Sequence, residues 1–151
     1  MNLTGSTLSA DAVHAYLRSV KEEEEAKQRA HQAVAKAERD KLRHAFTERE
    51  VRPEALDRIA TLVRKSVEMG EKQALVLQFP SDWLPDQGRA ITDHHRNWPR
   101  KLEGFPRKAY DFFVRELEPR GFQLRAEVVS WPGGMPGDVG FFLAWKRPEE
   151  T

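Results

Sequence analysis

The feature that most constrains this chain is an abrupt change in composition near residue 50. The first fifty positions contain one glycine, no proline and ten large apolar residues, whereas the other 101 contain eight glycines, nine prolines and 33 large apolar residues. A packed core needs large apolar side chains, and the turns of a compact domain need glycine and proline. The sequence therefore predicts an N-terminal segment without a core of its own, followed by a globular domain over residues 50–151.

A single long helix is predicted over residues 9–46, because no proline or glycine interrupts this run of good helix formers. Ser9 and Asp11 are both suitable N-caps, and residues 1–8 are expected to form a flexible N-terminus. At 1.5 Å per residue the helix would be roughly 55 Å long, whereas a compact body of about 100 residues has a radius of gyration of only about 13 Å. Such a helix would overhang its domain, which predicts an oligomerisation or partner-binding arm.

Apolar side chains occur only near the two ends of this predicted helix. Its middle, residues 21–29, is nearly all charged, and strict heptads would place Glu23 and Lys27 at core positions, which argues against a continuous parallel coiled coil. Two interpretations remain: a solvated charged helix packed at its ends, or an antiparallel homodimer in which the apolar ends meet. The apolar residues are Val13, Tyr16, Leu17 and Val20 near the start, and Ala30, Val34, Ala37, Leu42 and Phe46 near the end.

Further helices are predicted in the C-terminal part. Residues 47–50 have the spacing of a capping box and Pro53 suits a first helical turn, so a helix should begin there and run to Gly70. A periodic apolar pattern predicts another helix over residues 106–118. A short helix over residues 89–97 is expected within a polar, proline-broken connection.

Three strands are also expected. Residues 74–79 form a continuous apolar run, residues 122–128 alternate strictly between apolar and polar, and residues 139–145 are apolar on both faces. These patterns predict an α+β fold in which the long N-terminal helix is followed by a small three-stranded sheet with helices packed on one face, in the order α-α-β-α-β-β. We expect the third strand to lie in the centre, because only that strand offers apolar side chains on both sides.

Composition excludes several classes of function. The absence of cysteine excludes a disulfide framework, a thiolate zinc site, an iron–sulfur cluster and a thiol nucleophile. A net charge of +1 is not the basic excess of a protein that coats nucleic acid. No signal peptide, membrane span, nucleophile elbow, P-loop or dinucleotide fingerprint is recognisable. We therefore expect a soluble, cytoplasmic protein without a cofactor, and its preference for arginine and alanine is typical of a GC-rich bacterial genome.

The triplet Asp93-His94-His95 resembles the signature of the DHH phosphoesterase family, whose members hold two divalent metals. The resemblance covers three residues, and the preceding residues 87–92 are too polar for the buried strand that carries the signature in that family. With Asp82 or Asp86, the triplet would suit a single zinc, manganese or iron ion. It thus supplies an alternative function, a small metal-dependent hydrolase, against the simpler interpretation of a surface loop or helix end.

Residues 94–108 carry the one strong charge asymmetry, five cations against Glu103. Trp98 and Phe105 are interleaved with these cations, and aromatic rings beside arginine and lysine are typical of single-strand nucleic-acid binding. The competing interpretations are a contact with an acidic protein and a merely solvated connection in which Phe105 packs against its own helix. The candidate contact residues are Arg96, Trp98, Arg100, Lys101, Arg107 and Lys108.

No pattern in the sequence identifies an activity, and no catalytic, cofactor-binding or metal-binding residue is assigned. The glycine-rich run 132–138 would suit an anion-binding nest, although an ordinary loop reversal needs the same glycines. The leading hypothesis is a non-enzymatic binding or adaptor module that forms a homodimer or engages a protein partner through the 9–46 helix. An anion or nucleic-acid contact at residues 94–108 would be an addition to that role.

Overall fold

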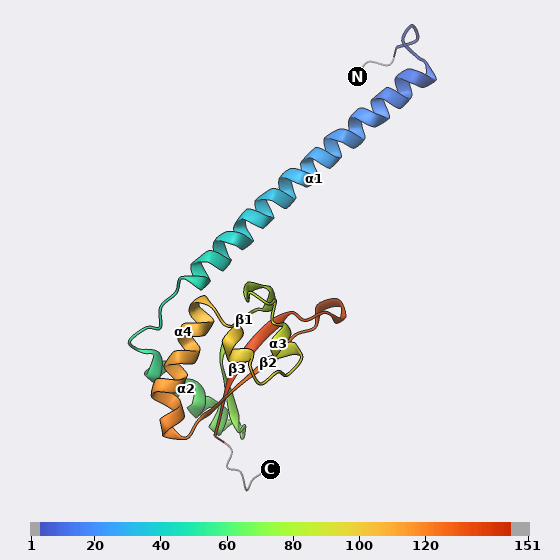
Figure 1. The fold of residues 1–151 in the computed structure, drawn as a ribbon. Helices are drawn as coiled ribbons and strands as arrows, with labels where there is room; N and C mark the ends of the chain where they lie inside the picture. Colours follow the sequence, from blue (N-terminus) through green and yellow to red (C-terminus); the bar gives the residue numbers. More distant parts are fainter. Residues whose placement is uncertain (1–3, 146–151) are drawn as a thin grey trace. The chain divides into compact units, whose positions relative to one another are not determined.

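The computed structural model describes residues 4–145, and contacts within the chain separate two units, residues 1–43 and 44–151. Helix α1, Ala10–Thr47, is continuous for 38 residues (Figure 1). Its N-cap is Ser9, whose hydroxyl oxygen accepts a hydrogen bond from the backbone N–H of Ala12 at 3.0 Å. The predicted long helix and one of its two suggested caps are therefore confirmed.

Within the first unit, the described residues 4–43 contain no second helix or strand against which α1 could pack. No side chain described between residues 10 and 43 is buried, and the exposed fractions are 56% for Leu17, 62% for Val34 and 60% for Leu42. Although the helix is long, none of the helices in the described part of the chain is apolar enough to cross a membrane.

The second unit is the small α+β body that the sequence predicts. Its helices and strands follow the expected order, with short 3₁₀ turns between them. In chain order the main elements are α2 (Ala55–Glu68), β1 (Gln73–Pro80), α3 (Arg89–Thr92), α4 (Gly104–Phe112), a π-helical continuation (Phe113–Leu117), β2 (Gln123–Val128) and β3 (Asp138–Ala144).

The sheet is antiparallel with the strand order β1-β3-β2, so the strand that is apolar on both faces is central, as predicted. Val139, Phe141 and Leu143 of β3 are at most 1% exposed, because side chains from the helices cover this face. On the opposite face Leu75 is 39% exposed. The helices thus pack on one face of the sheet (Figure 1).

The end of α1 belongs to the core of the second unit. Phe46 is 8% exposed, and its ring lies 5.4 Å from Phe79, 5.0 Å from Trp83 and 5.4 Å from Phe105. The backbone of Gly104 also lies close to Thr47 at the end of α1, because a Cβ on Gly104 would lie 2.6 Å from the Cγ2 atom of Thr47. Aromatic packing therefore holds the last turn of α1 inside the globular body.

Three helix boundaries differ from the prediction. The capping box at residues 47–50 does not form, because α1 continues through Thr47 and α2 begins only at Ala55. Pro53 disfavours helical geometry in the preceding residue, which explains why α1 does not continue directly into α2. The helix predicted over residues 89–97 ends at Thr92, and α4 begins two residues earlier than expected, at Gly104.

Candidate functional site

Three of the cations predicted in the 94–108 segment are available at the surface. Arg96, Arg100 and Lys101 are exposed, and none of them has an ion-pair or hydrogen-bonding side-chain partner among residues 4–145. Arg100 and Lys101 lie on one 3₁₀ turn, Trp98–Lys101. These three side chains retain the capacity to bind an anion.

The other two cations of this segment have partners within the body. The guanidinium of Arg107 donates a hydrogen bond to the carbonyl oxygen of Pro99 at 3.1 Å and forms an ion pair with Asp111 at 3.3 Å. The ammonium group of Lys108 pairs with the carboxylate of Glu50. A binding role for Arg107 or Lys108 would compete with these contacts.

The two aromatic rings of the segment face the core. Trp98 is half-buried, with its ring 5.8 Å from Tyr110 and 5.6 Å from Phe141, and Phe105 is 9% exposed. Base stacking requires an open ring face. The structure therefore places cations at this surface without an open aromatic ring beside them. Cations and rings alternate along the sequence, but they do not lie side by side on the surface of the folded chain.

The Asp93-His94-His95 triplet is the end of helix α3. His94 has a left-handed backbone with φ of 56°, and its N–H bonds to the carbonyl of Ile91, while the N–H of His95 bonds to that of Ala90 at 2.8 Å. This pair of hydrogen bonds is the Schellman arrangement that terminates helices. The interpretation of the triplet as a helix end is thus confirmed.

The acidic residues near the triplet do not complete a metal site. The carboxylate of Asp86 accepts hydrogen bonds from the N–H groups of Gly88 and Ala90 at 2.9 and 3.0 Å, so it caps the start of α3. No group of three or more His, Asp or Glu side chains in residues 4–145 is arranged to hold a metal ion. The Nε2 atom of His95 lies 4.0 Å from the carboxylate of Asp93, and both side chains are exposed.

Backbone N–H groups of the glycine-rich run 132–138 are hydrogen-bonded within the loop itself. Those of Gly134 and Met135 bond to carbonyls of the same loop, and those of Gly137 and Asp138 bond to the backbone and hydroxyl oxygens of Ser130 at 2.8 Å. An anion-binding nest requires free N–H groups that converge. The run is a loop reversal between β2 and β3.

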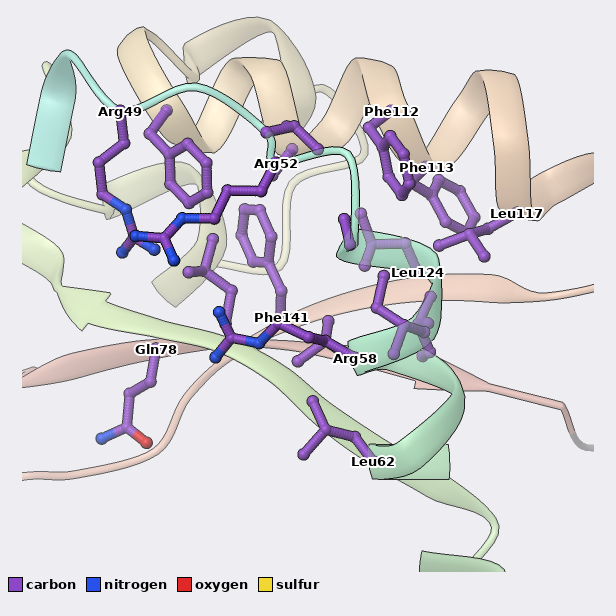
Figure 2. Close-up of a pocket in the computed structure, with 18 of the residues that line it drawn as sticks. Arg49, Arg52, Arg58, Leu62, Gln78, Phe112, Phe113, Leu117, Leu124 and Phe141 are labelled. Atoms are coloured by element: carbon purple, nitrogen blue, oxygen red, sulfur yellow. The ribbon is translucent and has the colours of Figure 1, made fainter. Parts of the chain in front are cut away.

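A cavity of about 290 Å³ lies in the second unit, between α2, α4 and the covered face of the sheet. Its interior is apolar, and its walls come from both helices and all three strands (Figure 2). The apolar lining includes Ile59 and Leu62 from α2, Phe112, Phe113 and Leu117 from the α4 region, and Leu124, Phe141 and Leu143 from the sheet.

Three arginines border the same cavity. Arg49 and Arg52 come from the connection between α1 and α2, and Arg58 comes from the first turn of α2. Figure 2 shows their guanidinium groups on one side of the cavity and the side chains of Phe112, Phe113, Leu117 and Leu124 at the other end. The Arg49 guanidinium lies 4.7 Å from the centre of the Phe105 ring. The cavity therefore has a cationic side and an apolar side.

Sequence reasoning missed this cavity. The only signal in the sequence is the presence of Arg49, Arg52 and Arg58 within ten positions, and acidic residues between them hide the surplus of positive charge. The one carboxylate in the lining, Glu50, is paired with Lys108 from α4, which is 58 positions away. Pairing over such a distance emerges only in the folded chain.

The chain matches no protein-family model, no curated protein and no solved structure.

Proposed function

We propose that this protein is a non-enzymatic binding or adaptor module whose long helix α1 self-associates. The observation that carries the proposal is the apolar surface that α1 exposes: Tyr16, Leu17 and Val20 are 44%, 56% and 38% exposed within a unit whose described residues, 4–43, contain no other helix or strand. With Val13 they recur at three- and four-residue steps, so they form one stripe on the helix. Burying one such side chain contributes about 1.5–3 kcal/mol.

A two-fold antiparallel pairing of α1 suits both the apolar ends and the charged middle. If Leu17 of one copy meets Leu42 of the other, then Lys21 lies opposite Glu38 across the contact. Two-fold symmetry is the commonest arrangement of homo-oligomers. Charge complementarity at the middle thus accompanies apolar contact at the ends, and the expected assembly is a homodimer.

Sedimentation equilibrium at tens of micromolar tests this proposal. The expected mass is twice the chain mass of 17.4 kDa. Leu17→Glu with Val20→Glu should shift the equilibrium to monomer, because two carboxylates would be buried in the contact. Ala26→Glu is the matched control, since residue 26 lies on the face of the helix opposite Leu17 and should leave the dimer intact.

A monomeric mass for the unaltered chain would show that self-association is wrong. The helix would then serve a different protein, and the same variants test that version. A partner that uses the apolar stripe should be retained by the unaltered chain and by the Ala26→Glu variant, but not by the Leu17→Glu, Val20→Glu variant. Equal retention by all three would place the partner contact elsewhere.

We also propose an accessory anion contact at Arg96, Arg100 and Lys101. Three exposed cations without partners among the described residues support it. The ligand is either a nucleic-acid backbone or an acidic protein surface, and the two differ in how binding depends on salt.

A further inference from the structure

The size of the cavity between α2, α4 and the sheet fits a small molecule. Protein interiors have few voids larger than a water molecule, whereas small-molecule sites occupy roughly 300–1,000 Å³ and are mostly apolar with a few polar groups. At about 290 Å³ this cavity reaches the lower end of that range. Its far end is lined by side chains that are nearly fully buried, including Leu117 at 4% and Leu143 at 0% exposure.

The charge at the open side of the cavity favours an anion. Arg52 and Arg58 have no carboxylate within 4 Å among residues 4–145, and the only acidic residue in the lining, Glu50, is neutralised by Lys108. Ala55, the first residue of α2, also lines the cavity, so the positive end of that helix dipole lies on the same side. Cationic groups beside low-dielectric walls raise the local concentration of anions.

We propose that this cavity binds a small amphipathic anion, with a carboxylate or phosphate head and a short apolar body. The guanidinium groups of Arg52 and Arg58 hold the head, because their fork of N–H donors matches two oxygens of an oxyanion. The apolar body lies against Phe112, Leu117 and Leu124 at the far end (Figure 2). This site is separate from the α1 stripe, so its test does not depend on self-association.

Calorimetric titration of the full chain with octanoate, octyl phosphate and octanol tests the charge of the ligand. Both oxyanions should bind at least tenfold more tightly than the neutral alcohol, and the tighter of the two identifies the head group. Hexanoate should bind about tenfold more weakly than octanoate, because it buries two fewer methylene groups. Octanol binding as tightly as octanoate, or no binding of either oxyanion at millimolar concentration, would overturn the proposal.

Two variants test the position of the site. Arg52→Ala with Arg58→Ala should weaken octanoate binding at least tenfold and leave octanol binding unchanged. Arg64→Ala with Arg89→Ala is the matched control, because both side chains are exposed cations outside the cavity lining, and it should bind octanoate normally. Unchanged octanoate affinity in the Arg52, Arg58 variant would show that the anion binds elsewhere.

A third variant tests the apolar end. Ala109 lines the cavity from α4, and Ala109→Phe should fill it and weaken both oxyanions and octanol. Thermal unfolding identifies a variant that fails to fold. In that event Leu124→Ala, which removes part of the apolar wall at the same end, serves instead, and it should weaken octanoate more than hexanoate.

Discussion

The two units of the chain differ in whether their apolar side chains are buried. Every buried apolar side chain among the described residues lies at or beyond Phe46, whereas no side chain described between residues 10 and 43 is buried. The first unit is held by the local hydrogen bonds of one helix, and the second by packing between elements that are distant in sequence. Substitutions in the two units should therefore have effects of very different size.

The comparison also predicts that α1 would gain more stability from association than the second unit would. Isolated helices are marginally stable in water, and most helix stability in proteins comes from burial of an apolar face. α1 gains that burial only from another molecule or another part of the chain. The second unit already has a core built from Phe79, Phe141 and Leu143.

The largest contrast is expected between core and helix substitutions. Phe79→Ala should lower the free energy of unfolding by about 3–5 kcal/mol, because Phe79 is 2% exposed and packs on Phe46 and Phe141. Glu22→Ala should change it by less than about 0.5 kcal/mol, because Glu22 is exposed and lies on the side of α1 away from Leu17. Urea denaturation followed by tryptophan fluorescence measures both. Effects of equal size would contradict the division into two units.

Two fragments test where the boundary between the two units lies. Residues 44–151 retain Phe46 and should unfold cooperatively, with nearly the stability of the full chain. Residues 50–151 lack Phe46 and should be less stable by about 3 kcal/mol, the lower end of the cost of truncating a buried phenylalanine, because this ring is 8% exposed. Thermal unfolding of the two fragments measures the difference. If they are equally stable, Phe46 does not contribute to the core.

The smallest expected effect is that of replacing exposed cations, either in residues 94–108 or in α1. Binding of a single-stranded oligonucleotide at low salt should fall when Arg96, Arg100 and Lys101 are replaced by alanine, and the log–log slope against salt should flatten by about 0.7 for each phosphate that is no longer neutralised. Replacing Lys27, Arg29 and Lys36 in α1 is the matched control, because it removes the same number of positive charges from a helix that also carries the acidic run 22–25. Fluorescence anisotropy measures both. A slope that is equal in both variants would leave an acidic protein as the partner.

Much of the fold was predictable because it depends on local pattern. Strand β3 is apolar on both sides, and only the central position of a three-stranded sheet buries the backbone edges and side chains of such a strand. The long helix followed from the absence of breakers over 38 residues. The capping box at Thr47 was wrong because packing of Phe46 and the restriction before Pro53 outweigh a local capping preference.

The candidate sites were less predictable because they depend on tertiary contacts. Sequence separation does not show that Lys108 reaches Glu50, or that the Trp98 ring turns toward Tyr110 and Phe141. For the same reason the sequence does not show that only three of the five cations in residues 94–108 lack partners among the described residues, or that both aromatic rings of this segment face the core. The arginines of the cavity were not predicted because no local spacing distinguishes a cavity wall from a solvated connection.

The two outer strands of the sheet carry features that discourage unwanted β-pairing. The register of β1 shifts between Leu75 and Leu77, and this strand ends at Pro80, which has no N–H to offer a neighbour. Strand β2 presents the ion pair of Arg125 and Glu127. Irregular or charged edges are poor templates for a further strand. Although one face of the sheet is uncovered, its two outer strands therefore discourage growth of the sheet by addition of a further strand.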